Sequence, residues 1–342
     1  MSVLELRDVE VEYRRAGQPP LRAVAGASLT VDAGQIVGLV GETGCGKSTL
    51  ARAAVGLQAT TAGTIWFEGR KLAPLRRRAR SRQDARLQMV FQNPFSSLNP
   101  RRKVGNQIAD GMAILGQVPS ARRPERVAEL LDQVGLPANA AQRFPHQYSG
   151  GQRQRIAIAR ALAAEPSVIV LDEPLSSLDA SAQAQVANLL TGLARELRVG
   201  LLLISHDLAI VRHIADVVAV MYLGLVVETA PTRRLWTAPL HPYTEALIEA
   251  IPRADGSGWL PEALPGEVPD PAHPPAGCRF HPRCPYAFER CRTEPPPLVE
   301  IVDGRQVACW LHERGSSERA PSQFARRTRA AGSAVGDQVD RV

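Results

Sequence analysis

The stretch GETGCGKST at positions 41–49 decides the fold class. It matches the phosphate-loop pattern G-x-x-x-x-G-K-[ST] at Gly41, Gly46, Lys47 and Ser48. Its glycines let backbone N–H groups close around phosphate oxygens, and the following helix adds a favourable dipole. We expect Lys47 to reach the β- and γ-phosphates and the Ser48 hydroxyl to bind Mg²⁺. An apolar run before the loop and a helical pattern after it argue against the alternative, a glycine-rich surface turn.

Around this loop, compact apolar runs alternate with helical patterns, which predicts an α/β fold with a mostly parallel, buried sheet. In 180–197, apolar side chains recur at spacings of three and four and predict one helix. Residues from about 100 to 164 are expected to form an inserted helical subdomain. The expected central strands are 35–41, 89–91, 168–172, 201–205 and 217–222. Shorter strands are expected at 3–7, 9–13, 27–31 and 63–67.

A second motif, VIVLDEP (168–174), reads as a buried strand that ends in two carboxylates. A carboxylate in this position can hold Mg²⁺, directly or through water, and a second can orient or deprotonate an attacking water. These roles are assigned to Asp172 and Glu173 respectively. Strands often end in acidic residues, so the motif gains its value from the motifs around it.

The stretch YSGGQRQRIAIARAL (148–162) resembles the signature sequence of ATP-binding cassette (ABC) ATPases. Four further residues stand in the order of that family's adenine-stacking aromatic, Q-loop, D-loop and switch histidine: Tyr13, Gln92, Asp179 and His206. The resemblance covers residues 1–230 and implies a RecA-like core, an antiparallel β subdomain and the helical insert. It implies an ATPase nucleotide-binding domain over 1–235.

The resemblance also implies a mechanism. Glu173 is expected to act as base for in-line attack of water on the γ-phosphate, His206 to contact that phosphate, and Gln92 to contact Mg²⁺ or the water. The ATP-binding residues are expected to be Tyr13, Gly41, Thr43, Gly44, Cys45, Gly46, Lys47, Ser48, Thr49, Gln92, Asp172 and His206. The Mg²⁺ ligands would be Ser48, Gln92 and Asp172. In this family the signature residues serve the ATP of a second, head-to-tail subunit: Ser149, Gly150, Gly151, Gln152 and Asp179.

Composition and charge exclude some classes of protein. The amino terminus lacks the apolar region of a signal peptide, and VVAVMYLGLVV (217–227) is about half a membrane span, better explained as two strands. The net charge is +7, with six arginines in 75–86 and more in the tail from 314. Such runs can bind nucleic acid or lipid, but a solvated face and a disordered tail over 313–342 are expected, with no nucleic-acid partner.

The carboxyl-terminal region indicates the branch of the family. Sequences at 240–252, 264–271 and 278–291 resemble the extension of peptide/nickel importer ATPases, which implies a small Pro/Cys-rich domain over 236–312. The resemblance implies a second ATPase subunit, two membrane permeases and, indirectly, an extracytoplasmic binding protein. It places the chain at the cytoplasmic face of the membrane, with di- or oligopeptides as cargo. Nickel, glutathione or oligosaccharide import, or a soluble ABC machine, are the alternatives.

Four of the five cysteines lie in this region, at Cys278, Cys284, Cys291 and Cys309. Twelve prolines fall between positions 252 and 297, so the segment has little apolar surface for a core. It therefore needs an additional cross-link, such as a metal centre, to fold. Four thiolates can hold zinc or a [4Fe–4S] cluster, although the spacing fits neither common pattern. Resemblance to cluster-binding peptide-importer ATPases favours the cluster; buried, unliganded thiols are the other alternative. In the phosphate loop, Cys45 is either a reactive thiol or merely a variable position, and the second is favoured.

Overall fold

Five neighbouring parallel strands, in the order β9-β3-β8-β7-β6, form one side of an eight-stranded mixed sheet that ends at β6. Every residue of β3, β7 and β8 is buried, as expected for parallel strands covered on both faces. The predicted parallel sheet is therefore confirmed. The strand bounds are β3 Ile36–Val40, β6 Leu87–Val90, β7 Val168–Asp172, β8 Gly200–Ile204 and β9 Val217–Tyr222.

A second, antiparallel sheet has the order β2-β1-β4-β5. Its strands are β1 Ser2–Tyr13, β2 Leu21–Asp32, β4 Ala62–Phe67 and β5 Arg70–Lys71. The sequence predicts two strands where β1 is one. The reason is a bulge near Asp8, which has a φ of 48° and a shift in pairing register. The bulge interrupts the alternation but not the strand.

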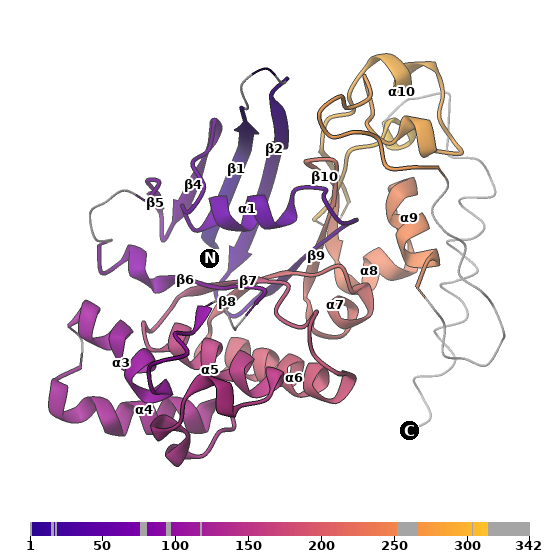
Figure 1. The fold of residues 1–342 in the computed structure, drawn as a ribbon. Coiled ribbons are helices and arrows are strands. Elements are labelled where there is room, and N and C mark those ends of the chain that lie inside the picture. The colour runs from indigo at the N-terminus through magenta and orange to yellow at the C-terminus, as the bar shows by residue number, and fades with distance from the viewer. Residues whose placement is uncertain are drawn as a thin grey trace, which may run out of the picture.

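The central sheet lies between the larger helices on one side and helix α1 with the antiparallel sheet on the other (Figure 1), and each side contains an apolar core. Val37 and Leu39 of β3 face the core that contains helix α1 (Lys47–Ala54) and the antiparallel sheet. Ile36 and Val40 of the same strand face the core that contains the remaining large helices. Successive side chains of a strand point to opposite faces, so this one strand contributes to both cores.

The helices of the second core include the predicted insert. They are α3 Val104–Leu115, α4 Arg123–Gln133, α5 Gly150–Leu162, α6 Ala180–Leu197 and α7 Leu208–Ile214. The bounds of α6 equal those predicted from its apolar periodicity. Short 3₁₀ helices connect the larger elements at Asp84–Arg86, Ser120–Arg122, Ala138–Gln142, Pro145–Gln147, His281–Arg283 and Trp310–His312.

The carboxyl-terminal segment continues the central sheet instead of folding on a core of its own. Strand β12 (Arg305–Val307) pairs with β10 (Leu225–Pro231), and β11 (Val299–Val302) pairs with β12. Phe280 lies in the same core as the sheet residues. The expectation that a metal centre must replace a missing apolar core is therefore incomplete, because the segment also packs against the core of the cassette. The helices that follow β10 are α8 Thr232–Thr237, α9 Pro242–Glu249 and α10 Glu289–Thr293.

The structure describes residues 2–14, 17, 19–75, 81–93, 97–116, 118–251, 266–302 and 304–313. Positions 314–342 of the predicted disordered tail, and positions 76–80 of the basic run, lie outside this range. Within it, β9 and β10 confirm that 217–227 forms two strands. Of the helices described, none combines the length and the apolar character needed to cross a membrane.

Candidate nucleotide site

The phosphate loop connects β3 to α1, and its backbone requires two of its glycines. Gly41 has a φ of 154°, and an added Cβ would lie 2.1 Å from the carbonyl oxygen of Met221. Gly46 has a φ of 108°, and its Cβ would lie 2.2 Å from the carbonyl oxygen of Ala23. A side chain at either position would therefore clash with backbone as well as strain the loop.

Lys47 lies inside the loop that precedes it. Its ammonium group donates to the carbonyl oxygens of Gly41, at 2.7 Å, and Glu42, at 2.8 Å, and the side chain is buried. The Cys45 sulfur lies 3.7 Å from the same nitrogen, and burial raises the pKa of its thiol. A buried thiol with a raised pKa is a poor nucleophile, which supports the view that Cys45 fills a variable position. Thr43 and Gly44 are exposed, and Thr49 is half-buried.

The start of α1 meets the end of β7. Ser48 Oγ donates to Asp172 Oδ1 at 2.8 Å, which joins two of the three predicted Mg²⁺ ligands across 124 positions of sequence. Burial raises the pKa of Asp172, and the hydrogen bond from Ser48 opposes that shift. A hydroxyl and a carboxylate beside each other form the hard oxygen donor set that Mg²⁺ prefers. The residues present therefore fit the predicted ion.

Glu173 holds a small polar cluster at the end of β7. Its Oε2 accepts a hydrogen bond of 3.0 Å from Gln92 Nε2 and lies 3.3 Å from His206 Nδ1. The backbone of Glu173 has a φ of 46°, a rare conformation for a residue with a side chain, and its N–H donates to Ile204 O at 3.0 Å. Strained backbone of this kind often occurs at functional positions. The fold thus brings all three predicted catalytic side chains together.

The signature residues lie on a different helix, on the other side of the central sheet. Ser149 is the amino-terminal cap of α5, and its hydroxyl accepts from the N–H of Gln152 at 3.3 Å. The Gln152 side chain accepts from the N–H of Ser149 at 3.1 Å, which completes a capping box. Asp179 caps α6 in the same way, accepting from Ala182 N at 2.8 Å. Residues of α5 belong to one core and those of α1 to the other.

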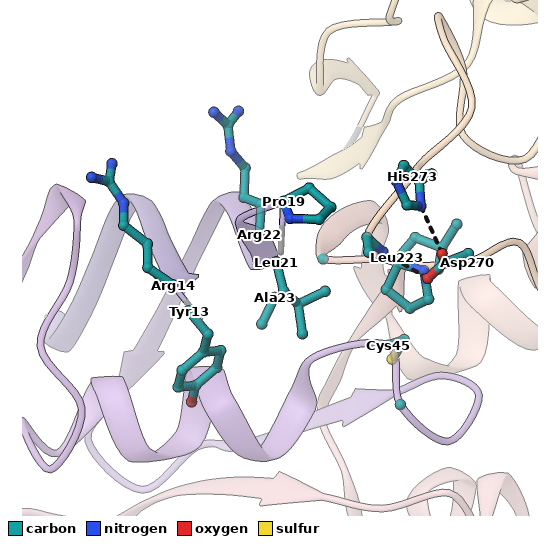
Figure 2. A pocket seen from close by; sticks show the side chains of 14 residues that line it. Tyr13, Arg14, Pro19, Leu21, Arg22, Ala23, Cys45, Leu223, Asp270 and His273 are labelled. Atoms are coloured by element: carbon teal, nitrogen blue, oxygen red, sulfur yellow. Dashed lines mark hydrogen bonds and ion pairs between the residues drawn. The ribbon is translucent and has the colours of Figure 1, made fainter. Parts of the chain in front are cut away.

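A pocket of about 720 Å³ opens beside the phosphate loop. Figure 2 shows Tyr13 on one side of this pocket and Asp270 with His273 on the other. Gly44 and Cys45 of the loop also line it. The position of Tyr13 suits the predicted stacking on adenine, and its hydroxyl lies 3.4 Å from Gln58 Oε1. The wall that contains Asp270 comes from the carboxyl-terminal segment.

The four clustered cysteines line one small cavity of about 10 Å³. Burial raises the pKa of Cys278, of Cys284 to about 12, and of Cys309. Among the described residues, no group of three or more His, Cys, Asp or Glu side chains is arranged to hold a metal ion. The arrangement therefore gives no support to a single zinc ion or to a cluster, and the cavity would have to widen to admit a cluster. The neighbouring His281 hydrogen-bonds through Nδ1 to the Cys278 carbonyl.

Family models match two parts of the chain: "ABC transporter" over residues 24–176 and "Oligopeptide/dipeptide transporter, C-terminal region" over 227–291. A probable peptide ABC transporter ATP-binding protein of Sinorhizobium fredii is 49% identical over 319 residues, which cover 93% of this chain and 90% of the relative. The chain belongs to the family of ABC transporter ATP-binding proteins. It is therefore an ATPase, as the sequence motifs predict.

Further comparisons agree with this membership. A di/tripeptide transport ATP-binding protein, DppF, of Pseudomonas aeruginosa is 46% identical over 92% of this chain and 98% of its own. Among solved structures, a dimeric post-hydrolysis state of the ATP-binding cassette MJ0796 bound to ADP and Pi matches with a TM-score of 0.59. It is 26% identical and covers 67% of this chain and 99% of its own. The ABC cassette fold is thus confirmed.

Three residues at the phosphate loop were not singled out from the sequence: Glu42, Tyr243 and Arg283. Glu42 stands at an x position of the loop pattern, which carries no side-chain requirement. Tyr243 lies in LHPYTEAL and Arg283 lies next to Cys284, so both belong to stretches noticed only for other reasons. Both contact Glu42 across more than 200 positions of sequence, a separation that no local pattern indicates.

Proposed function

We propose that the chain is the ATP-hydrolysing subunit of a membrane importer of di- or oligopeptides. The observation that carries this proposal is the meeting of Gln92, Glu173 and His206 beside the Ser48–Asp172 pair at the phosphate loop. The relatives with printed peptide-transport names and the match to the oligopeptide/dipeptide transporter C-terminal region support the cargo. The subunit would lie at the cytoplasmic face of the membrane, attached to two permease subunits.

In the proposed site, the loop amides and Lys47 bind the phosphates of ATP and Tyr13 stacks on adenine. Ser48 and Asp172 hold Mg²⁺, with Gln92 as a further ligand, and the ion supplies charge neutralisation on the phosphate oxygens. Glu173 accepts a proton from the attacking water while His206 contacts the γ-phosphate. Since Gln92 and His206 contact the Glu173 carboxylate in the structure, nucleotide binding must exchange these contacts for contacts to the water and the phosphate.

A second subunit completes the site in this proposal. The start of α5, with Ser149, Gly150, Gly151 and Gln152, presents amide groups and a positive helix end, which suit phosphate. Asp179, the amino-terminal cap of α6, would lie at the same interface between the two chains. Two chains would meet head to tail and enclose ATP between the α1 end of one and the α5 end of the other. The second subunit would be a copy or a related chain.

The domain limits follow from this assignment. We place the ATPase domain at 1–235, with its helical insert at about 100–164, and the transporter-type extension at 236–312. The pairing of β12 with β10 joins the two, and the tail from 313 is assigned no role.

We also propose that Cys278, Cys284, Cys291 and Cys309 hold a [4Fe–4S] cluster. All four side chains line one cavity, which supports the assignment. Four thiolates can complete a [4Fe–4S] cluster, and a single zinc ion is the alternative. About four irons and four sulfides per chain, with absorption near 400 nm that bleaches on reduction, are expected in protein purified without oxygen. A stably folded, metal-free chain would overturn this assignment.

The cargo is tested by reconstituting the chain with its permease subunits and the matching binding protein. We expect di- or tripeptides to stimulate ATP hydrolysis several-fold. Stimulation by Ni²⁺ or by oligosaccharides, with no response to peptides, would move the protein to another branch of the family. Hydrolysis by the chain with no response to any cargo or permease would favour a soluble ABC machine.

A further inference from the structure

Two side chains of the carboxyl-terminal segment contact the phosphate loop directly at Glu42. The guanidinium of Arg283 donates to both oxygens of the Glu42 carboxylate, at 2.8 and 3.1 Å. The Tyr243 hydroxyl accepts a hydrogen bond of 2.9 Å from the Glu42 backbone N–H. The remaining polar group of Glu42, its carbonyl, accepts from the ammonium of Lys47 at 2.8 Å. One residue therefore connects the segment to the predicted phosphate-binding lysine.

These contacts lie in a shielded environment. The Arg283 side chain is 3% exposed and that of Glu42 is 21% exposed. The Arg283 guanidinium lies 5.9 Å from the ring centres of both Tyr222 and Phe280. Electrostatic interactions strengthen as water is excluded, and a bidentate arginine–carboxylate pair fixes direction as well as distance. Such a pair restricts the position of Glu42 more tightly than a solvent-exposed pair could.

The aromatic rings hold the two contacting side chains in place. Tyr222 packs against Tyr243 with ring centres 4.6 Å apart and against Phe280 at 5.3 Å. Phe280 packs in turn against Tyr243, at 5.3 Å. Tyr222 belongs to β9 of the cassette, whereas the other two rings belong to the following segment. The cluster thus fixes Tyr243 relative to the sheet that carries the loop.

The phosphate loop would be flexible without contacts that fix its conformation. Gly41, Gly44 and Gly46 all have positive φ, and a glycine-rich loop loses much conformational entropy when it is fixed around a ligand. Holding the loop in its binding conformation beforehand reduces that loss and raises affinity. We propose that Arg283 and Tyr243 are positioning residues of the phosphate loop, which hold Glu42 and through it Lys47 ready for the phosphates of ATP. This inference rests on the proposed nucleotide site.

The test measures the dissociation constant for MgATP with full-length chains, together with the melting temperature without nucleotide. Arg283→Met is expected to weaken MgATP binding at least ten-fold, and Tyr243→Phe, which keeps the ring, about three-fold with a nearly unchanged melting temperature. Arg290→Met is the matched control, since Arg290 lies in the same segment and pairs with Glu294 away from the loop. It should bind MgATP within two-fold of the wild type.

A second comparison separates positioning from general stability. Replacing Arg283 alone leaves the Glu42 carboxylate without its bidentate partner, so Glu42→Gln in the Arg283→Met background should recover part of the lost affinity. MgATP affinities of Arg283→Met and Tyr243→Phe within two-fold of the wild type would overturn the inference. So would a loss in Arg283→Met that Glu42→Gln restores in full, because the loss would then come from the uncompensated carboxylate charge and not from the position of the loop.

The control Lys47→Ala shows which idea has failed. If the wild type binds MgATP, Lys47→Ala does not, and the Arg283 and Tyr243 variants match the wild type, only the positioning role is wrong. If the wild type fails to bind MgATP, or Lys47→Ala binds as well as the wild type, the nucleotide site and the inference that rests on it are both overturned.

Discussion

The two helix amino termini assigned to ATP differ in how their first amides are occupied. At α1, the preceding residue is Gly46, in a left-handed conformation, and no side chain caps the helix. At α5, Ser149 and Gln152 form a capping box in which each side chain accepts from the other's backbone. At α1 no side chain occupies the helix end, whereas at α5 the capping box engages the amides of Ser149 and Gln152 but not those of Gly150 and Gly151.

This difference suggests a division of labour. No capping side chain has to leave the α1 end when phosphate binds, so α1 can bind ATP in a single chain. At α5 the two hydrogen bonds of the capping box would have to be exchanged before the Ser149 and Gln152 groups could contact phosphate, so α5 gains less until a second chain delivers the nucleotide to it. The following predictions test this comparison, from the largest expected effect to the smallest.

Glu173→Gln should trap a dimer in which the α1 end of one chain and the α5 end of the other bind the same ATP. The amide cannot accept the proton of the attacking water, so turnover is expected to fall about 1,000-fold, or about 4 kcal/mol of barrier, while MgATP binding persists. ATP hydrolysis and size-exclusion chromatography with ATP measure the two effects. Glu196→Gln, at an exposed position of α6, is the control. Full hydrolysis by Glu173→Gln would contradict the role of base.

Lys47→Ala should disable the uncapped α1 end. It removes the charge that approaches the phosphates, and MgATP affinity of the single chain is expected to fall about 100-fold, or about 2.7 kcal/mol. Titration with a fluorescent ATP analogue measures the change, with exposed Lys71→Ala as the control. Unchanged affinity would show that α1 is not the primary binding end.

His241→Asn extends the comparison of helix ends to α9, whose amino-terminal cap can be lost by protonation. Nδ1 of buried His241 caps α9 by accepting from Tyr243 N at 3.0 Å, and burial, with His312 nearby, lowers the pKa of His241 to about 3. Between pH 6.5 and 3 the unfolded chain binds a proton there and the folded chain does not, so stability falls as pH falls. From pH 7 to 5 the contribution is about 2 kcal/mol of unfolding free energy.

Asparagine keeps a capping acceptor but does not titrate. Urea unfolding at pH 7 and pH 5 should therefore show that His241→Asn loses about 2 kcal/mol less than the wild type over this interval. Exposed His213→Asn serves as the control. Equal pH dependence in the wild type and His241→Asn would mean that this cap is not the acid-sensitive one.

Ser149→Ala should weaken the capped α5 end without touching the uncapped α1 end. Loss of an N-cap hydroxyl costs about 1 kcal/mol of unfolding free energy. MgATP binding by the single chain should stay within two-fold, whereas ATP-dependent dimerisation of the Glu173→Gln background should weaken. Exposed Ser181→Ala is the control. A parallel loss of single-chain ATP binding would erase the distinction between the two ends.

Elements with strong local patterns could be predicted closely. Strand β7, strand β9 and helix α6 have the bounds expected from their apolar runs and periodicity. A short motif also predicts where chemistry lies when strand, loop and helix are consecutive, as in the phosphate loop. The Ser48–Asp172 contact could be anticipated because the carboxyl ends of parallel strands share one edge of a sheet.

Features that depend on distant residues could not be predicted. The pairing of β12 with β10 rests on two residue pairs, and nothing in the local sequence of Arg305–Val307 indicates its partner. The bond of Arg283 to Glu42 spans 241 positions. The proline-rich composition predicts that the carboxyl-terminal segment has little core of its own. It could not indicate that an existing core would accept Phe280.

The pairing of β12 with β10 has a consequence for solubility. A chain ended after Ile251 would leave β10 as a bare edge, with backbone donors and acceptors free to pair with another molecule. It would also uncover the rings of Tyr222 and Tyr243, which are now buried against Phe280. An open edge beside exposed aromatic surface favours aggregation. Trimming this protein to a minimal cassette should therefore yield insoluble material, even though every nucleotide motif would be retained.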